Sequence, residues 1–176
     1  MTSIYLAGPL FSEAERAFLD RLAAGLRERG HDVFVPHEQF RKDMVELDAA
    51  TVFRVDVEGL RRANQLVAWL DGPMVDDGTA CEIGIFAELV ASGDPRYQGI
   101  VGLVTDLRTQ RRRGTSGDGI NLFVAGAVQA SGELTWSVDD AFDAVDRLAA
   151  AGEARATGEA RPTDEARATG ASTPAR

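Results

Sequence analysis

Short apolar runs alternate with helical patterns along the first 150 residues, and this alternation constrains the fold more than any other feature. The runs at 4–7, 32–35, 66–70, 100–104 and 134–136 are predicted strands. Helices are predicted from the capping box of Ser12 and Glu15 to Gly30, and over 49–63, 79–90, 122–130 and 138–150. Because alternating strands and helices build covered parallel sheets, the sequence predicts an α/β, doubly wound, five-stranded parallel sheet with helices on both faces.

The loops after the predicted strands mark where a ligand is expected. In doubly wound sheets, ligands bind beyond the carboxyl ends of the strands, at a switch in strand order. Gly8, the Asp- and Gly-rich loop 71–78 and the polar loop 106–120 all lie at that edge.

The chain divides near Ala150 into an expected catalytic domain, 1–150, and a low-complexity tail, 151–176. No Leu, Ile, Val, Phe, Tyr or Trp follows Leu148, and a near-repeat of E-A-R-A-T-G fills 153–170. A segment with so little apolar surface cannot offset its ordering entropy, so we expect a disordered tail without a catalytic role.

Composition excludes several classes of protein. The net charge of −9 argues against a nucleic-acid polymer as partner, since such proteins present a basic face. No apolar run is long enough to span a bilayer, and the N-terminus has no basic region typical of a signal peptide. One cysteine, Cys81, excludes an internal disulfide and any multi-cysteine metal site. We therefore expect a cytoplasmic, soluble protein without a metal and with no membrane partner.

Familiar cofactor and nucleophile motifs are missing. The sequence contains no G-x-G-x-x-G after the first strand, no phosphate-binding P-loop and no G-x-S-x-G elbow. A phosphoacceptor receiver domain is disfavoured, because the first strand ends in L-A-G-P instead of an acidic pair. His31 and His37 are interpreted as turn or surface residues, and Cys81 as a packing residue.

The carboxylates are the informative feature. Asp76 and Asp77 precede a predicted helix, and Glu82 is placed in its first turn, where the helix N-terminus is expected to keep a carboxylate ionised. Asp56, on the preceding helix, is expected across the pocket. Glycosyl transfer needs such a set, with one carboxylate attacking the anomeric carbon and another moving a proton. An ordinary helix N-cap with an acidic surface remains the alternative from spacing alone.

Five segments, in order, resemble the nucleoside 2-deoxyribosyltransferase family. They are I-Y-L-A-G-P-L-F at 4–11, P-H-E-Q-F at 36–40, D-V-E-G-L at 56–60, D-D-G-T-A-C-E-I-G at 76–84 and G-I-N-L-F at 119–123. The fourth matches the family's Asp-x-Gly-x-x-x-Glu-x-Gly signature. The resemblance covers about residues 3–145 and implies a flavodoxin-like fold.

The resemblance implies roles for residues in all five segments. Glu82 would be the nucleophile, Asp76 the proton donor and acceptor, Asp56 a holder of base and sugar, and Tyr5 the group that orients Glu82. The residues implied to bind substrate are Gly8, Phe11, Gln39, Asn121 and Phe123. Asn121 would enter a neighbouring subunit's site, so a homo-oligomer, dimer or hexamer, is expected.

The implied activity is transfer of a 2-deoxyribosyl group from a deoxyribonucleoside to a free nucleobase, in nucleotide salvage. It would proceed through a covalent glutamyl intermediate, without a cofactor and with hydrolysis as side reaction. One departure is that some members end in an aromatic residue and a terminal carboxylate that complete the neighbour's site, where this chain continues into its tail.

Two alternatives stay open. A 2'-deoxynucleoside 5'-monophosphate N-glycosidase would need a phosphate pocket, for which Arg111, Arg112 and Arg113 are candidates, although the first turn lacks phosphate-binding character. A non-catalytic nucleotide-binding module is the second alternative, and the intact carboxylate set argues against it.

Overall fold

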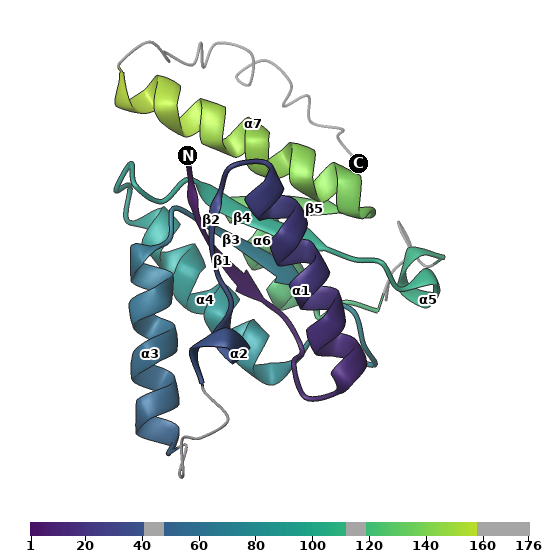
Figure 1. Ribbon diagram of the computed structural model, residues 1–176. Helices are drawn as coiled ribbons and strands as arrows, with labels where there is room; N and C mark the ends of the chain where they lie inside the picture. Colours follow the sequence, from purple (N-terminus) through teal and green to yellow (C-terminus); the bar gives the residue numbers. More distant parts are fainter. Residues whose placement is uncertain (41–47, 112–118, 158–176) are drawn as a thin grey trace, which may run out of the picture.

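The chain forms one parallel sheet of five strands. The structure, a computed structural model, describes residues 1–40, 48–111 and 119–157. The strands are β1 (Ser3–Ala7), β2 (Asp32–Phe34), β3 (Gln65–Trp69), β4 (Gly99–Leu103) and β5 (Gly132–Thr135), in the order β2-β1-β3-β4-β5 (Figure 1). All four pairings are parallel. The predicted α/β class and five-stranded parallel sheet are confirmed.

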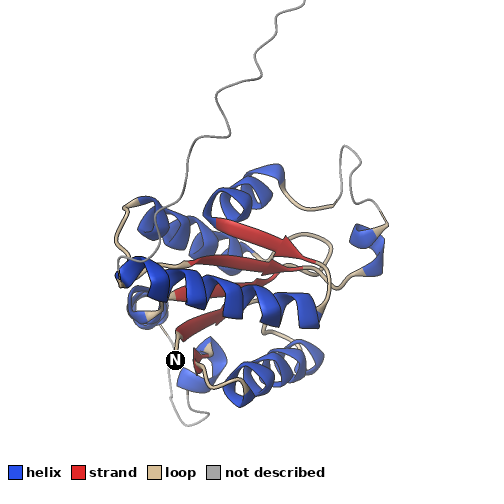
Figure 2. Cartoon of the chain, turned by 90° about the horizontal axis from the view of Figure 1, so that it is seen from above, coloured by secondary structure: helices blue, strands red, loops and turns tan. Residues whose placement is uncertain are grey.

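Helices cover both faces of this sheet (Figure 2). Helices α1 (Glu13–Glu28) and α7 (Val138–Ala156) pack on one face, while α3 (Ala49–Arg62), α4 (Asp77–Ala91) and α6 (Leu122–Ser131) pack on the other. The alternation of side chains along β1 separates the two cores. Tyr5 and Ala7 face α3 and α4, whereas Ile4 and Leu6 face α1 and α7.

The strand order places a ligand edge between β1 and β3. The chain moves from β1 outward to β2, and then returns past β1 to β3, so the direction of winding reverses there. The loops that follow these two strands therefore diverge to opposite faces and leave a crevice at the carboxyl edge of the sheet.

Two short helices differ from the predicted layout. The chain forms α2 (Pro36–Gln39) directly after β2, and α5 (Leu107–Gln110) within the segment predicted as a loop over 106–120. Each is a single turn, begun by Pro36 at the first helical position or by the cap of Asp106. Residues 112–118 of that predicted loop lie outside the described residues.

The last helix is longer than predicted. Helix α7 continues to Ala156, six residues past the predicted end at Ala150, because Ala, Glu and Arg all favour helix. Buried Gly152 lies against the side chain of Gln98, where a Cβ would meet the amide at 2.7 Å. The structured domain thus reaches into the predicted tail, and residues 158–176 lie outside the described part.

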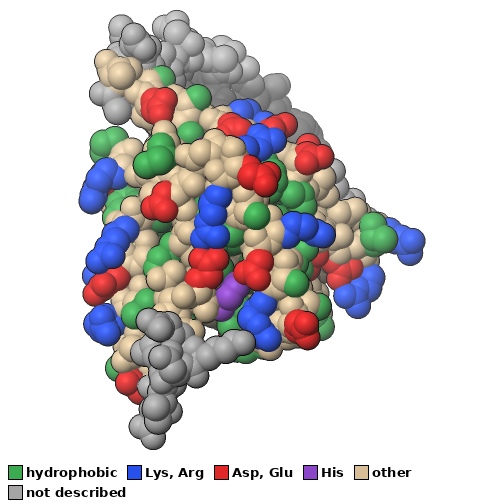
Figure 3. Space-filling view, viewed as in Figure 1, with side chains coloured by type: hydrophobic (Ala, Val, Ile, Leu, Met, Phe, Trp, Pro, Cys, Tyr) green, Lys and Arg blue, Asp and Glu red, His purple; other side chains and the backbone are tan. Residues whose placement is uncertain are grey.

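The surface agrees with the charge balance of the sequence. On the face seen in Figure 3, basic and acidic side chains are interspersed instead of gathered into a basic patch. Within the described residues, no helix is both long and apolar enough to cross a membrane. The same residues contain no group of three or more His, Cys, Asp or Glu side chains that could hold a metal ion.

Candidate active site

A cavity of about 470 Å³ opens at the crevice between β1 and β3. Five parts of the chain wall it: the loop after β1, the first turn of α1, the region of helix α2, helix α3 and the start of α4. The lining residues are Gly8, Leu10, Phe11, Arg16, Pro36, His37, Phe40, Val52, Asp56, Asp76, Gly78, Thr79 and Glu82. Its volume is that of a small-molecule site, and its walls are mainly apolar with convergent carboxyl groups at one side.

Asp76 is fixed by the helix that it begins. It is the N-cap of α4, and its Oδ2 accepts hydrogen bonds from the Thr79 backbone N–H at 2.9 Å and the Thr79 hydroxyl at 3.0 Å. Thr79 is itself buried. Since both bonds go to one oxygen, Oδ1 is left for a ligand in the cavity.

Glu82 lies six residues after Asp76, in the second turn of α4, and is held by Tyr5. The Tyr5 hydroxyl donates a hydrogen bond of 2.5 Å to Glu82 Oε1. Tyr5 lies at the centre of β1 and has no exposed surface, so its hydroxyl contacts Glu82 from the buried side, away from the cavity. Burial, followed by the charge of Glu82, raises the pKa of Tyr5 and keeps this hydroxyl a donor.

The structure corrects the expected protonation of Glu82. Burial raises its pKa to about 8, the charges of Asp56 and Asp76 act in the same direction, and the Tyr5 hydrogen bond opposes them. With Asp76 as N-cap, Glu82 stands in the second turn, whereas the field of a helix N-terminus falls off within the first. Desolvation therefore outweighs the helix, and the prediction that the helix keeps Glu82 ionised is wrong.

Asp56 supplies a third carboxyl from α3. Its Oδ1 is buried and accepts no hydrogen bond from the described residues. Burial raises the pKa of this carboxyl, and the Tyr5 hydroxyl partly opposes the rise. A buried oxygen without a partner is costly, so this atom is suited to receive a donor from a bound ligand.

The structure brings together most, but not all, of the residues expected at the site. Asp56, Asp76, Glu82, Gly8 and Phe11 line the cavity, and Tyr5 lies directly beneath it. Gln39 does not line it; its side-chain amide donates to the carbonyl of Val35, the N-cap of α2, at 3.2 Å.

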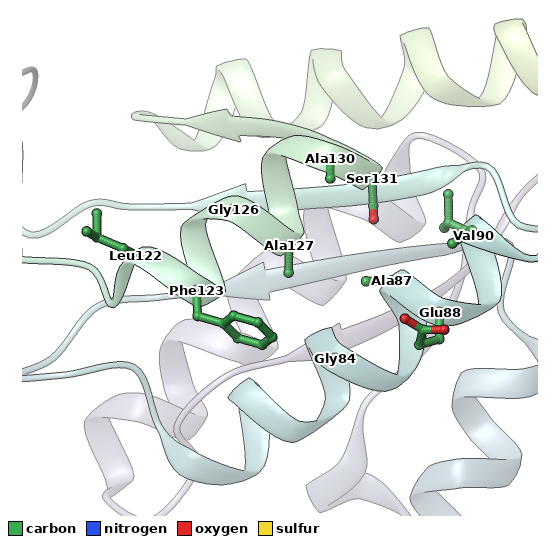
Figure 4. A pocket seen from close by; sticks show the side chains of 11 residues that line it. Gly84, Ala87, Glu88, Val90, Leu122, Phe123, Gly126, Ala127, Ala130 and Ser131 are labelled. Atoms are coloured by element: carbon green, nitrogen blue, oxygen red, sulfur yellow. The ribbon is translucent and has the colours of Figure 1, made fainter.

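Asn121 and Phe123 also lie away from this cavity. Asn121 is the N-cap of α6, with Oδ1 accepting from the Phe123 N–H at 2.9 Å. Phe123 is 84% exposed and points across a second, apolar hollow toward Gly84 of α4 (Figure 4). Neither residue lines the cavity that holds Asp56, Asp76 and Glu82.

Several cavity residues were missed by sequence reasoning. His37 lines the cavity from α2, with Nε2 paired to Asp20 Oδ1 at 2.8 Å, although it was interpreted as a turn or surface residue. Arg16 holds the loop after β1 by donating to the carbonyls of Leu10 and Phe11, both at 2.8 Å. Arg16 lies four residues after Ser12, the N-cap of α1, at a position where a charged residue is typical of an exposed helix surface. Its sequence position therefore does not indicate a cavity residue.

This arrangement has the chemistry of a glycosyl-transfer site. The Glu82 carboxyl is oriented by the Tyr5 phenol, and the Asp76 carboxyl keeps one oxygen that is not used by Thr79. The Asp56 carboxyl has a buried oxygen without a hydrogen-bond partner among the described residues. Reaction at an anomeric carbon needs such groups, because one oxygen attacks while another carries the proton of the leaving group.

The chain belongs to the nucleoside 2-deoxyribosyltransferase family, whose model matches residues 4–124. This family is enzymatic, and it acts on nucleosides and nucleobases. No curated protein matches the chain.

Solved structures share the fold. A conserved protein from Enterococcus faecalis is 28% identical with a TM-score of 0.68, over 84% of this chain and 98% of that one. A 2-deoxyribosyltransferase from Bacillus psychrosaccharolyticus is 23% identical with a TM-score of 0.56, over 80% and 90%. The CMP N-glycosidase of Clostridium botulinum is 16% identical with a TM-score of 0.53, over 82% and 98%.

Proposed function

We propose that the protein transfers the 2-deoxyribosyl group between nucleobases through a covalent intermediate on Glu82, with hydrolysis as side reaction. The observation that carries the proposal is the Tyr5–Glu82 hydrogen bond of 2.5 Å inside a cavity that also holds Asp56 and Asp76. A hydrogen bond to one oxygen of Glu82 leaves the other directed for attack. The aromatic rings of Phe11 and Phe40 offer apolar surface for a base.

In the first half of the reaction, a Glu82 oxygen attacks C1' and the bond from C1' to the base nitrogen breaks. The electron pair of that bond stays on the base, which takes a proton from Asp76. In the second half, the nitrogen of an incoming base attacks C1' and gives its proton to Asp76. The electron pair of the ester bond returns to Glu82, so two displacements retain the configuration at C1'.

The raised pKa of Glu82 means that the carboxyl groups hold the proton that this mechanism needs. Burial, reinforced by the charges of Asp56 and Asp76, raises the pKa of Glu82 to about 8, so Glu82 holds a proton near neutral pH. The reactive state has that proton on Asp76 and none on Glu82. A bound sugar or base that donates to Asp56 Oδ1 would favour this state by stabilising the remaining negative charge.

The direct test is base exchange. The protein is incubated with deoxyinosine plus adenine or cytosine, and the products are resolved by chromatography. Formation of deoxyadenosine or deoxycytidine is expected, and Glu82→Ala should reduce it at least ~1,000-fold, as expected for loss of a nucleophile. A 2-fluoro-2-deoxyribosyl substrate should leave an adduct on Glu82. Nucleoside binding without exchange or hydrolysis would instead indicate a binding module.

A 5'-monophosphate N-glycosidase remains the second candidate because a guanidinium lines the cavity. Only one terminal nitrogen of Arg16 is engaged by the loop carbonyls, so the rest of the group can meet a phosphate. Arg111 does not line this cavity, and Arg112 and Arg113 lie outside the described residues. Deoxynucleoside 5'-monophosphates that are hydrolysed faster than nucleosides, with the preference lost in Arg16→Gln, would favour this candidate.

A further inference from the structure

We propose that Phe34 and Gly59 are positioning residues for the nucleophile, because together they lock the Tyr5 ring whose hydroxyl holds Glu82. The inference rests on the proposed function for its role in catalysis. It assigns a task to two residues that do not line the cavity.

The first half of this lock is a ring stack between neighbouring strands. Tyr5 of β1 and Phe34 of β2 are register partners in the parallel ladder. Their ring centroids lie 5.1 Å apart and their planes are inclined by only 19°. Phe34 therefore covers one face of the Tyr5 ring and limits its rotation about the Cβ–Cγ axis and its lateral displacement.

The second half is the close approach of α3. Gly59 is buried, and a Cβ there would lie 2.9 Å from Phe34 Cε1 and Cζ and 3.0 Å from Tyr5 Cε2. Real Cβ atoms are not found so close to ring carbons, so only glycine allows the helix backbone to rest on both rings. The two rings are thus held between the sheet and the backbone of α3.

The contact of Gly59 with the two rings also determines how far Asp56 extends into the cavity. Asp56 precedes Gly59 by three residues, so both lie on the face of α3 that is turned toward β1. If the helix moved outward by the width of a methyl group, Asp56 would withdraw from the cavity with it. This gives a physical reason for an aspartate and a glycine at this spacing.

The consequence falls on Glu82. The Tyr5 hydroxyl is the group that opposes the burial of Glu82 and lowers its pKa toward neutrality. A Tyr5 ring that is free to shift would make this hydrogen bond less often. Glu82 would then be ionised in a smaller fraction of molecules, and its attacking oxygen would be less well aimed.

The experiment compares Phe34→Leu with Phe142→Leu. Phe142 is also a partly buried phenylalanine, but it packs between α1 and α7, remote from the cavity. In Phe34→Leu, kcat should fall roughly tenfold with little change in KM, and the acid limb of the pH profile should move up by roughly half to one pH unit. Phe142→Leu should lower the melting temperature and leave both the pH profile and kcat near wild type.

A titration of the Glu82 carboxyl by 13C NMR tests the lock without any activity. Phe34→Leu should raise its midpoint, Gly59→Ala should do the same, and Phe34→Leu should add nothing in a Tyr5→Phe background. An unchanged midpoint in Phe34→Leu, or an equal rise in the presence and absence of the Tyr5 hydroxyl, overturns the inference. If the wild type shows neither exchange nor hydrolysis, the proposed function fails, and this titration alone decides whether the lock exists.

Discussion

At the scale of single residues, the protonation of Glu82 has a consequence for stability. Its pKa of about 8 in the folded chain lies above the 4.5 of an unperturbed glutamate, so folding favours the protonated form. The contribution to the free energy of unfolding is complete below about pH 4.5 and is lost as pH rises through about 8. We predict that Glu82→Gln, which stays neutral, becomes progressively more stable than wild type over this range.

Urea unfolding of both proteins at pH 5, 7 and 9 measures the effect. The matched control is Glu88→Gln, an exposed change on the same helix, which should keep a constant offset from wild type. A stability difference between Glu82→Gln and wild type that does not vary with pH would show that the Glu82 carboxyl is not desolvated as described.

Asp76 can be tested without disturbing its helix. Asparagine is as good an N-cap as aspartate, so Asp76→Asn keeps the bonds to Thr79 while removing the titratable proton. We predict a loss of ~100- to 10,000-fold with bases that must be protonated to leave, and a smaller loss with bases that leave readily unprotonated. Steady-state rates with a poor and a good leaving group measure this. Equal losses would restrict Asp76 to a structural role.

The identity of these side chains could be predicted from the sequence, but their electrostatics could not. The 76–84 segment places one carboxyl at a helix start and another six residues later, and this spacing is visible in the printed sequence. The burial of Glu82 depends on Tyr5, 77 positions away, and on Asp56 from another helix. Only the assembled fold brings these groups together. Local reasoning about the helix N-terminus therefore predicts a lowered pKa for Glu82, whereas its pKa is raised.

At the scale of elements, periodicity found the long helices and missed the single turns. Helix α1 repeats its buried residues Leu19, Leu22 and Leu26 at helical spacing along one face, a pattern that the sequence displays. Helix α2 has four residues and therefore no period to detect. Because α2 carries Pro36 and His37 to the cavity and is followed there by Phe40, missing this element also meant missing three cavity residues.

The end of α7 gives a prediction for truncation. A chain that stops after Thr157 removes only residues that carry no large apolar side chain, so its melting temperature should remain within about 2 °C of the full chain. A chain that stops after Ala150 also loses the last turns of α7 and the packing of Gly152 on Gln98, and it should melt several degrees lower. Thermal scans of the three lengths decide between them. Equal losses in both truncations would contradict this boundary.

At the scale of the whole molecule, Asn121 and Phe123 are the most informative of the three predicted substrate residues that lie outside the cavity. Leu122 and Phe123 at the start of α6 are 76% and 84% exposed, beside a hollow whose wall is formed mainly by small residues of α4 and α6 and also includes Glu88 (Figure 4). Asn121 and Phe123 do not line the cavity that holds Asp56, Asp76 and Glu82 of their own chain, so we predict that they contact substrate in a neighbouring subunit. A homo-oligomer with shared sites therefore remains our prediction.

Subunit mixing tests that prediction, provided the variant keeps its helix cap. Asn121→Ala would lose the hydrogen bonds to α6, whereas Asn121→Ser keeps a capping oxygen and removes only the side-chain amide. Loss of a buried polar contact to substrate should lower activity roughly 10- to 100-fold in Asn121→Ser, and Glu82→Ala should be inactive alone. In an exchanged equal mixture of dimers, half are mixed, and each holds one site with an intact Glu82 and a neighbour's intact Asn121. Activity should therefore return to about a quarter of wild type. An exchanged mixture that gains nothing, or a fully active monomer by light scattering, would mean that each chain completes its own site.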